Sequence, residues 1–134
     1  MMTKKSVKRG QDGPVRVDLM DHDHRDWPHV LASLNRRGHQ GALMLEDGYL
    51  STRQSLLVAR AGKTVVGHLC FHVEPVAAKW SEFHGCVEAR LDALSVRPGF
   101  GNREVTDLLI VAAKKRASVL RCACVVGLNG AGFE

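Results

Sequence analysis

The sequence predicts an α/β domain in which a mixed, mostly antiparallel β-sheet is flanked by helices on both faces. Residues 55–60 and 64–73 are strand-like runs joined by a tight turn, and this pattern predicts an antiparallel hairpin. A third strand at residues 87–96 is followed by an amphipathic helix and a short apolar strand, which predicts a strand–helix–strand crossover. The expected order of elements is β-α-(α)-β-β-β-α-β.

Three elements are expected before the hairpin. Residues 15–19 alternate apolar and polar side chains, which predicts a half-buried strand. A helix is expected at residues 27–35, with Asp26 as its N-cap. A second, weaker helix is expected at residues 42–52, where Gly48 interrupts the apolar pattern.

The second half of the chain carries the longest elements. The last three residues of the strand at 87–96 are uniformly small or apolar, as in a strand that is buried on both faces. The amphipathic helix is expected at residues 103–119, with Asn102 as its N-cap. A short buried strand is then expected at residues 122–128.

Length and charge are those of one globular domain. The chain has 134 residues, 45% of them hydrophobic and 25% charged, and a net charge of +5. Part of this charge lies in residues 1–14, which we expect to be a disordered basic tail ahead of a domain at 15–134. A nucleic-acid-binding arm is a weaker alternative, because no aromatic side chains interleave with the basic ones. A basic chain also attracts anionic cofactors.

Cysteine usage and hydropathy indicate a cytoplasmic protein. No cysteine belongs to a CxxC pair, and no signal peptide precedes the domain, so we expect reduced thiols. The apolar runs are far shorter than the ~20 residues of a membrane span, so no membrane association is expected. The four cysteines are Cys70, Cys86, Cys122 and Cys124.

Three segments resemble the GNAT family of acetyl-CoA-dependent N-acetyltransferases over residues 15–128. They read "LLVARAGKTVVGHL", "ARLDALSVRPGF" and, after the amphipathic helix, "CACVVGLN". In that family a strand ends in a Val-x-Pro-x-aromatic sequence, matched here by Val96, Pro98 and Phe100. The resemblance implies acetyl transfer from acetyl-CoA to an amine that attacks the thioester directly, without a covalent enzyme intermediate.

The loop that follows Phe100 departs from the family pattern. A helix N-terminus presents free N–H groups and partial positive charge, which suit a pyrophosphate. The family sequence is Arg/Gln-x-x-Gly-x-Gly/Ala, and this chain has Gly101, Glu104 and Thr106 at the three defined positions. Two unit charges about 5 Å apart at an effective dielectric constant of ~20 repel by roughly 3 kcal/mol, so Glu104 opposes pyrophosphate binding. Alternatively, a carboxylate in the first turn simply stabilises the helix.

The resemblance assigns two groups of site residues. Either Asp92 or Glu88 would be the general base. Asp92 is nearer the point where the resemblance implies that two neighbouring strands of the sheet separate. The alternative is that Glu88, Arg90 and Asp92 form a solvated face with local ion pairs. The family's usual general acid, a tyrosine after the fifth strand, has no counterpart, because the only tyrosine is Tyr49. Cofactor contacts are implied for Leu94, Val96, Gly101, Asn102, Arg103, Val105 and Thr106.

The sequence restricts the acceptor and the partner chain only to broad classes. The acceptor is expected to be a small-molecule or peptide amine. A full GNAT domain continues with a helix and two strands after the segment at 122–128, so we expect a domain incomplete at its C-terminus with an apolar sheet edge. A second chain can cover such an edge, which makes a homodimer an alternative. A catalytically inactive GNAT-like module that acts in binding or dimerisation is the alternative function.

Several other residue groups have both a functional and a structural interpretation. The segment Asp21-His22-Asp23-His24 has metal-binding residue types, and so do His68 and His72 together with two cysteines on the last strand. Turn formation and core packing explain them more simply, so no metal site is predicted. Trp80 and Phe83 could line a substrate groove or cap the core.

Overall fold

The fold is built on a mixed five-stranded sheet, as the sequence predicted. The computed structural model describes residues 14–21, 23–76 and 86–127. The strand order is β1-β4-β5-β6-β7; β6 and β7 pair in parallel and the other neighbours are antiparallel. The strands of this sheet are β1 (Val15–Met20), β4 (Gln54–Ala61), β5 (Thr64–Pro75), β6 (Val87–Val96) and β7 (Cys124–Val126).

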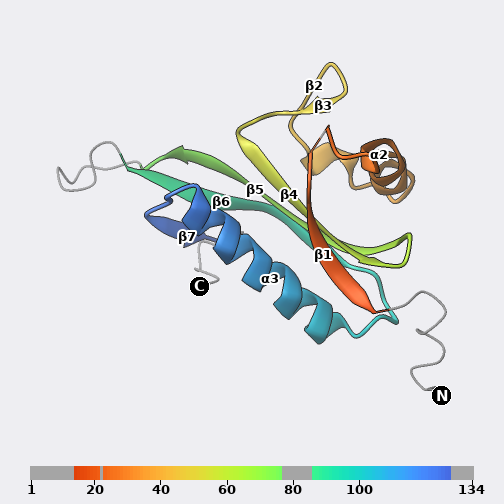
Figure 1. Ribbon diagram of the computed structural model, residues 1–134. Coiled ribbons are helices and arrows are strands. Elements are labelled where there is room, and N and C mark those ends of the chain that lie inside the picture. The colour runs from red at the N-terminus through yellow and green to blue at the C-terminus, as the bar shows by residue number, and fades with distance from the viewer. Residues whose placement is uncertain (1–13, 22, 77–85, 128–134) are drawn as a thin grey trace.

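Two helices cover opposite faces of the sheet (Figure 1). Helix α2 (Trp27–Arg36) lies on one face, beside a small hairpin of β2 (Leu45–Glu46) and β3 (Tyr49–Leu50). Helix α3 (Asn102–Val119) crosses the other face. Each helix buries its own apolar cluster against the strands, so the sheet separates two cores. We call the two sides the α2 face and the α3 face.

Helix α3 packs close to the sheet because its buried side is made of small and branched residues. Val105, Leu109, Ala113 and Ala117 recur every fourth position and are at most 3% exposed. At Gly67 on β5, a Cβ would lie 3.0 Å from the Ser95 carbonyl oxygen and 3.2 Å from Val105 Cγ1. Glycine at this position therefore permits the close approach of helix and sheet.

Helix α2 is tied to the sheet by a buried arginine. Arg60 on β4 donates to Asp18 on β1 at 2.5 Å and to Asp26 at 2.8 Å, and its side chain is 4% exposed. Asp26 is the N-cap residue, as predicted, but its carboxylate binds Arg60 and makes no capping hydrogen bond. Burial acts to raise the pKa of Asp18, but the hydrogen bond and charge of Arg60 outweigh it and hold that pKa below its usual value.

The prediction of a helix at residues 42–52 was wrong. A short 3₁₀ helix, η1 (Gln40–Ala42), is followed instead by the β2–β3 hairpin. Asp47 and Gly48 form its two-residue turn with φ of 56° and 83°. An Asp-Gly pair is a strong hairpin signal, and here it outweighs the apolar run of residues 43–45.

The ends of two other elements also differ from expectation. The N-cap of α3 is Gly101, and Asn102 is already the first helical residue. Gly101 has φ of 72°, a left-handed conformation that favours glycine, and the helix begins one residue earlier than predicted. Strand β7 is shorter than the predicted 122–128. Cys124 is exposed, and β7 is the last strand of the sheet among the described residues.

Some expectations lie outside the described residues. These are residues 1–13 of the expected tail, His22, residues 77–85 with Trp80 and Phe83, and residues 128–134. Within the described ranges no helix is long and apolar enough to cross a membrane.

Candidate active site

The sheet opens between β6 and β7. The two strands pair only at Glu88–Cys124, Ala89–Val125 and Arg90–Val126. In the part of the chain that the structure describes, the rest of β6 has no strand on this side. We call the point just after Arg90 the fork. The open edge of β6 beyond the fork leaves backbone groups free to bind a ligand.

Leu94 and Val96 present their peptide groups along this open edge. Arg97 donates its N–H to the carbonyl of Val66 on β5 at 2.7 Å, so the peptide group at position 97 faces β5. Peptide groups in an antiparallel strand alternate in direction from residue to residue. Those of Val96 and Leu94 therefore point away from β5, into the gap beyond the fork.

A β-bulge sets the direction of Asp92. Cys70 pairs with Ala93 and Phe71 pairs with Leu91, so Asp92 is the extra residue on β6. Leu91 packs in the α3-face core, whereas Ala93 packs in the α2-face core. The Asp92 side chain reaches partners on the α2 face just beyond the fork, 18% exposed.

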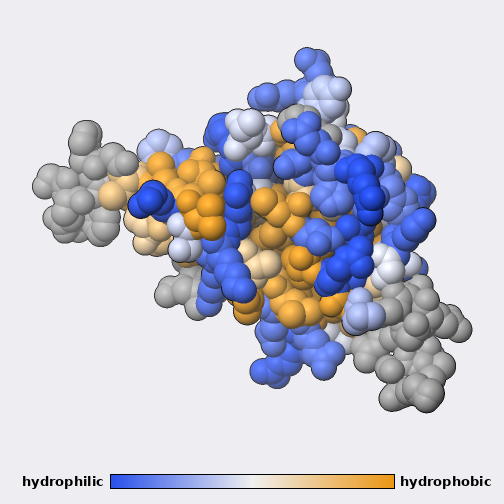
Figure 2. All heavy atoms as spheres, viewed as in Figure 1, coloured by the Kyte–Doolittle hydropathy of each residue, from blue (hydrophilic) through white to orange (hydrophobic). Residues whose placement is uncertain are grey.

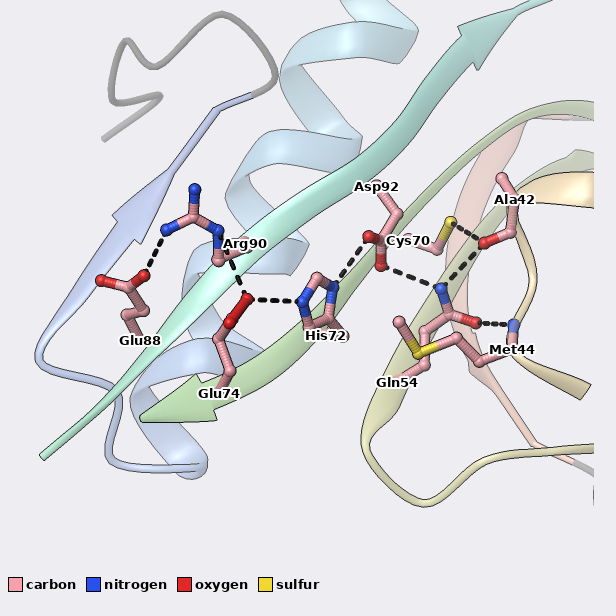
Figure 3. Close-up of polar contacts among 9 residues, drawn as sticks. All are labelled: Ala42, Met44, Gln54, Cys70, His72, Glu74, Glu88, Arg90 and Asp92. Atoms are coloured by element: carbon pink, nitrogen blue, oxygen red, sulfur yellow. Dashed lines mark hydrogen bonds and ion pairs between the residues drawn. The ribbon is translucent and has the colours of Figure 1, made fainter. Parts of the chain in front are cut away.

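Both carboxylate oxygens of Asp92 are held in hydrogen bonds (Figure 3). Oδ1 lies 2.8 Å from His72 Nδ1, and Oδ2 accepts from Gln54 Nε2 at 2.9 Å. Gln54 also donates to the Ala42 carbonyl at 3.0 Å and accepts from the Met44 N–H at 2.7 Å. These contacts lock the segment before β2 onto the strands that carry Asp92.

Glu88 has a different environment. It lies on the paired side of the fork, 7% exposed, and forms an ion pair with Arg90. Its other oxygen accepts a weak hydrogen bond from the Cys124 thiol at 3.7 Å. Arg90 also reaches Glu74 at 3.4 Å. The interpretation as local ion pairs therefore describes Glu88 and Arg90, whereas Asp92 is connected to them only through His72 and Glu74.

His72 and Glu74 complete this row of polar side chains (Figure 3). The two ring nitrogens of His72 lie 2.8 Å from Asp92 Oδ1 and 2.9 Å from Glu74 Oε2. The contact between His72 and Asp92 was not predicted from the sequence. The sequence places His72 and Asp92 on two separate strands with alternating side chains. The bulge that brings the two side chains together leaves no pattern in the sequence.

The loop before α3 carries the predicted cofactor segment. Gly99 and Gly101 both have positive φ, of 93° and 72°. The first intrahelical hydrogen bond runs from the Val105 N–H to the Gly101 carbonyl at 2.9 Å. The N–H groups of residues 102–104 precede it and are the ones that a helix leaves unpaired. This helix end can therefore bind an anion.

The predicted cofactor residues occupy unequal positions on this helix. The four residues from Gly101 to Glu104 are exposed. Val105 is 1% exposed and its N–H is used within the helix, so it supports the first turn from below. Thr106 is partly buried, and Glu104 lies in the first turn, where its charge faces solvent.

Two buried groups on the α2 face have displaced pKa values. Burial, with the charges of His39 and Arg37, lowers the pKa of His68 to about 4. The His68 ring lies 4.8 Å from that of His39, and its Nε2 has no hydrogen-bond partner among the described residues. Burial, with the charge of Asp92, raises the pKa of the Cys70 thiol to about 12.

The remaining residues that the sequence analysis singled out lie away from the fork or form no site among the described residues. Tyr49 is 56% exposed on β3. Within the described ranges no group of three or more His, Cys, Asp or Glu side chains could hold a metal ion. Figure 2 shows hydrophobic side chains exposed beside hydrophilic ones on the face that carries α3. On that helix they include Leu108, Val111 and Val119.

Solved structures with the same fold are N-acetyltransferases. The chain superposes on an aminoglycoside acetyltransferase from an uncultured soil metagenomic sample with a TM-score of 0.63 and 15% identity, covering 85% of this chain and 78% of that one. For the ribosomal-protein-alanine N-acetyltransferase of Brucella melitensis biovar Abortus 2308 the TM-score is 0.58 at 18% identity, with 85% and 79% covered. For AAC(6')-Iy in complex with the bisubstrate analogue CoA-S-monomethyl-acetylneamine the TM-score is 0.57 at 15% identity, with 86% and 79% covered.

These likenesses establish the fold. No protein-family model and no curated protein sequence matches the chain. The chain has the GNAT acetyltransferase fold, as its sequence predicted. Because a fold hosts many functions, its chemistry has to be argued from the fork and its side chains.

Proposed function

We propose that the protein transfers an acetyl group from acetyl-CoA to an amine, with Asp92 as the general base. The position of the Asp92 carboxylate is the observation that carries this proposal. It lies just beyond the fork, beside the open edge of β6 and 18% exposed. Glu88 supports the reaction less well, because it is 7% exposed and paired with Arg90.

The residues around the gap fit an extended anionic cosubstrate. The peptide groups of Leu94 and Val96 would pair with the pantetheine arm, and the N–H groups of residues 102–104 would receive the pyrophosphate. Arg103 is exposed beside these amides and would add a positive charge. The solved complexes of AAC(6')-Iy with CoA and with a CoA bisubstrate analogue support a cosubstrate of this type.

The chemistry then requires little from the protein beyond positioning and one proton transfer. Acetyl-CoA supplies an activated acetyl thioester. Asp92 would accept a proton from the bound ammonium group, which frees the nitrogen lone pair for direct attack on the thioester carbonyl. The C–S bond would then break, and CoA would leave as a thiol with the second proton that the attacking nitrogen loses. Gln54 and His72 hold the carboxylate in place through hydrogen bonds to its two oxygens. Such orientation is a substantial part of catalysis in general.

The acceptor would be a small-molecule or peptide amine. Proteins with this fold include aminoglycoside acetyltransferases and a ribosomal-protein-alanine N-acetyltransferase. Aminoglycosides and peptide N-termini share a primary amine that is protonated in solution. The half-buried carboxylates near the fork, Asp92 and Glu74, favour such a cation.

Glu104 favours a second candidate, an inactive GNAT-like module that acts in binding or dimerisation. Glu104 lies in the first turn of α3, the turn whose free amides would receive pyrophosphate. If this charge prevents binding, the fold keeps its shape and loses its cosubstrate.

Isothermal titration of the folded chain with acetyl-CoA and with free CoA separates the two candidates. Micromolar binding supports the acetyltransferase. An acetylation assay with sisomicin, n-butylamine and a peptide with N-terminal alanine then identifies the acceptor class. Absence of heat at millimolar acetyl-CoA, with the fold confirmed by circular dichroism, contradicts the acetyltransferase and leaves the inactive module.

A further inference from the structure

We propose that His72 is a positioning residue that relays the proton from Asp92 to Glu74 and so to solvent. The inference rests on the proposed acetyltransferase function. It adds the route by which the proton accepted by Asp92 leaves the site.

The geometry of the ring carries this inference. His72 Nδ1 lies 2.8 Å from Asp92 Oδ1, and its Nε2 lies 2.9 Å from Glu74 Oε2. Carboxylates only accept hydrogen bonds, so both contacts form when the ring is doubly protonated or when one carboxyl group carries a proton. A proton that Asp92 takes up can thus enter the ring at Nδ1 while another proton leaves the ring from Nε2 to Glu74.

Exposure is greatest at the Glu74 end of this chain. The side chains of Asp92 and His72 are 18% and 15% exposed, whereas that of Glu74 is 37% exposed. Asp92 lies at the fork and Glu74 lies two residues beyond His72 on β5. The chain therefore connects the proposed reacting centre with water through three side chains.

The proton balance is simple. The Asp92 carboxylate takes one proton from the ammonium group. Both contacts of the ring then form, because the Asp92 carboxyl group donates to Nδ1 and the ring, protonated on Nε2 alone, donates to Glu74. The carboxyl proton passes to Nδ1. The imidazolium that forms releases its Nε2 proton to the Glu74 carboxylate, which releases it to water. The half-buried ring then exchanges protons with water and returns to its starting tautomer.

Other charged groups near the ring tune this relay. Arg90 on β6 lies 3.4 Å from Glu74 and also pairs with Glu88. Cys70, two residues before His72 on β5, remains a neutral thiol because its pKa is about 12. Gln54 on β4, the Cα partner of His72, is uncharged and holds the far oxygen of Asp92.

The test compares His72→Gln, which can make hydrogen bonds but cannot carry a proton through its side chain, with wild type. Acetylation of sisomicin and n-butylamine by acetyl-CoA is measured across neutral and alkaline pH. We expect kcat of His72→Gln to fall about tenfold or more at neutral pH with little change in KM. We also expect its rate to rise toward that of wild type as the pH approaches the pKa of the amine, because free amine then needs no relay. Glu74→Gln should show the same trend.

Controls separate this role from a structural one. His29→Gln alters an exposed histidine that contacts the Lys63 carbonyl, and it should leave the rate and pH profile unchanged. Added imidazole should restore activity to His72→Ala, provided that circular dichroism shows a folded chain. If wild type acetylates an amine while His72→Gln keeps its rate and pH profile, the relay alone is overturned. If wild type binds acetyl-CoA but acetylates neither amine, the proposed activity on these amines and the relay both fail.

Discussion

Gln54 Nε2 and Asp92 Oδ2 lie 2.9 Å apart, although their strands are separated by β5. The same amide group donates to the Ala42 carbonyl, and Gln54 Oε1 accepts from the Met44 N–H. One buried side chain thus joins two strands to the segment before β2, and holds the proposed base at the fork.

Replacing Gln54 with alanine should destabilise the protein. The Met44 N–H would lose its partner, as would Asp92 Oδ2, and an unsatisfied buried polar group costs about 1–3 kcal/mol. Urea denaturation of Gln54→Ala measures the loss. Arg53→Ala, at the exposed neighbouring position, should change the free energy of unfolding by less than about 0.5 kcal/mol. Equal losses in the two variants would contradict the bridging role.

Removal of the Glu104 charge should strengthen acetyl-CoA binding. Repulsion of roughly 3 kcal/mol between unit charges about 5 Å apart corresponds to about a hundredfold in affinity, which is the upper bound for Glu104→Gln. Isothermal titration gives the two dissociation constants. Asp107→Asn makes the same change of charge one turn later, on another exposed residue, and should have a much smaller effect. An unchanged affinity in Glu104→Gln would mean that this carboxylate points away from the phosphates.

Burial of His68 should make stability fall in mild acid. Its pKa is lowered from 6.5 to about 4 in the folded chain, so between these values the unfolded chain binds a proton that the folded chain does not. Stability therefore rises with pH across this window, and it falls by about 3 kcal/mol as the pH drops through it. Urea denaturation at several pH values measures this slope.

The contribution of His68 is isolated by two variants. His68→Leu removes the titrating ring and should flatten the pH dependence, because a leucine fills the site without a proton to bind. His29→Gln changes an exposed histidine and should keep the wild-type slope. A slope that persists in His68→Leu would assign the effect to other groups.

The sequence predicted the sheet and both main helices because their signals are local. Alternation along β4 and β5 and the helical spacing of α3 need no knowledge of the partner strands. The β2–β3 hairpin was missed because the apolar run at 43–45 is also typical of a helix, and only the Asp47-Gly48 pair marks the turn. Asn102 was expected to be the N-cap of α3, whereas Gly101 occupies this position with a φ of 72°, which glycine adopts without strain.

The arrangement of the site residues was harder to predict from the sequence than the strands and helices. Asp92 and Glu88 were correctly placed on one strand, but the sequence could not show that one lies at the fork and the other is paired with Arg90. Their difference depends on where β7 leaves β6 and on the bulge at Asp92. Pairing register is fixed by contacts between distant segments, so neither feature leaves a period in the chain.

This difference between the two carboxylates leads to a direct test of the base. Asp92→Asn keeps the size of the side chain and removes its ability to accept a proton, so kcat for amine acetylation should fall by about 10²–10⁴-fold. Glu88→Gln should retain kcat within a few-fold, because Glu88 lies on the paired side of the fork and is occupied by Arg90. Steady-state kinetics with acetyl-CoA and n-butylamine compares the variants. A larger loss in Glu88→Gln than in Asp92→Asn, with both variants folded, would transfer the role of base to Glu88.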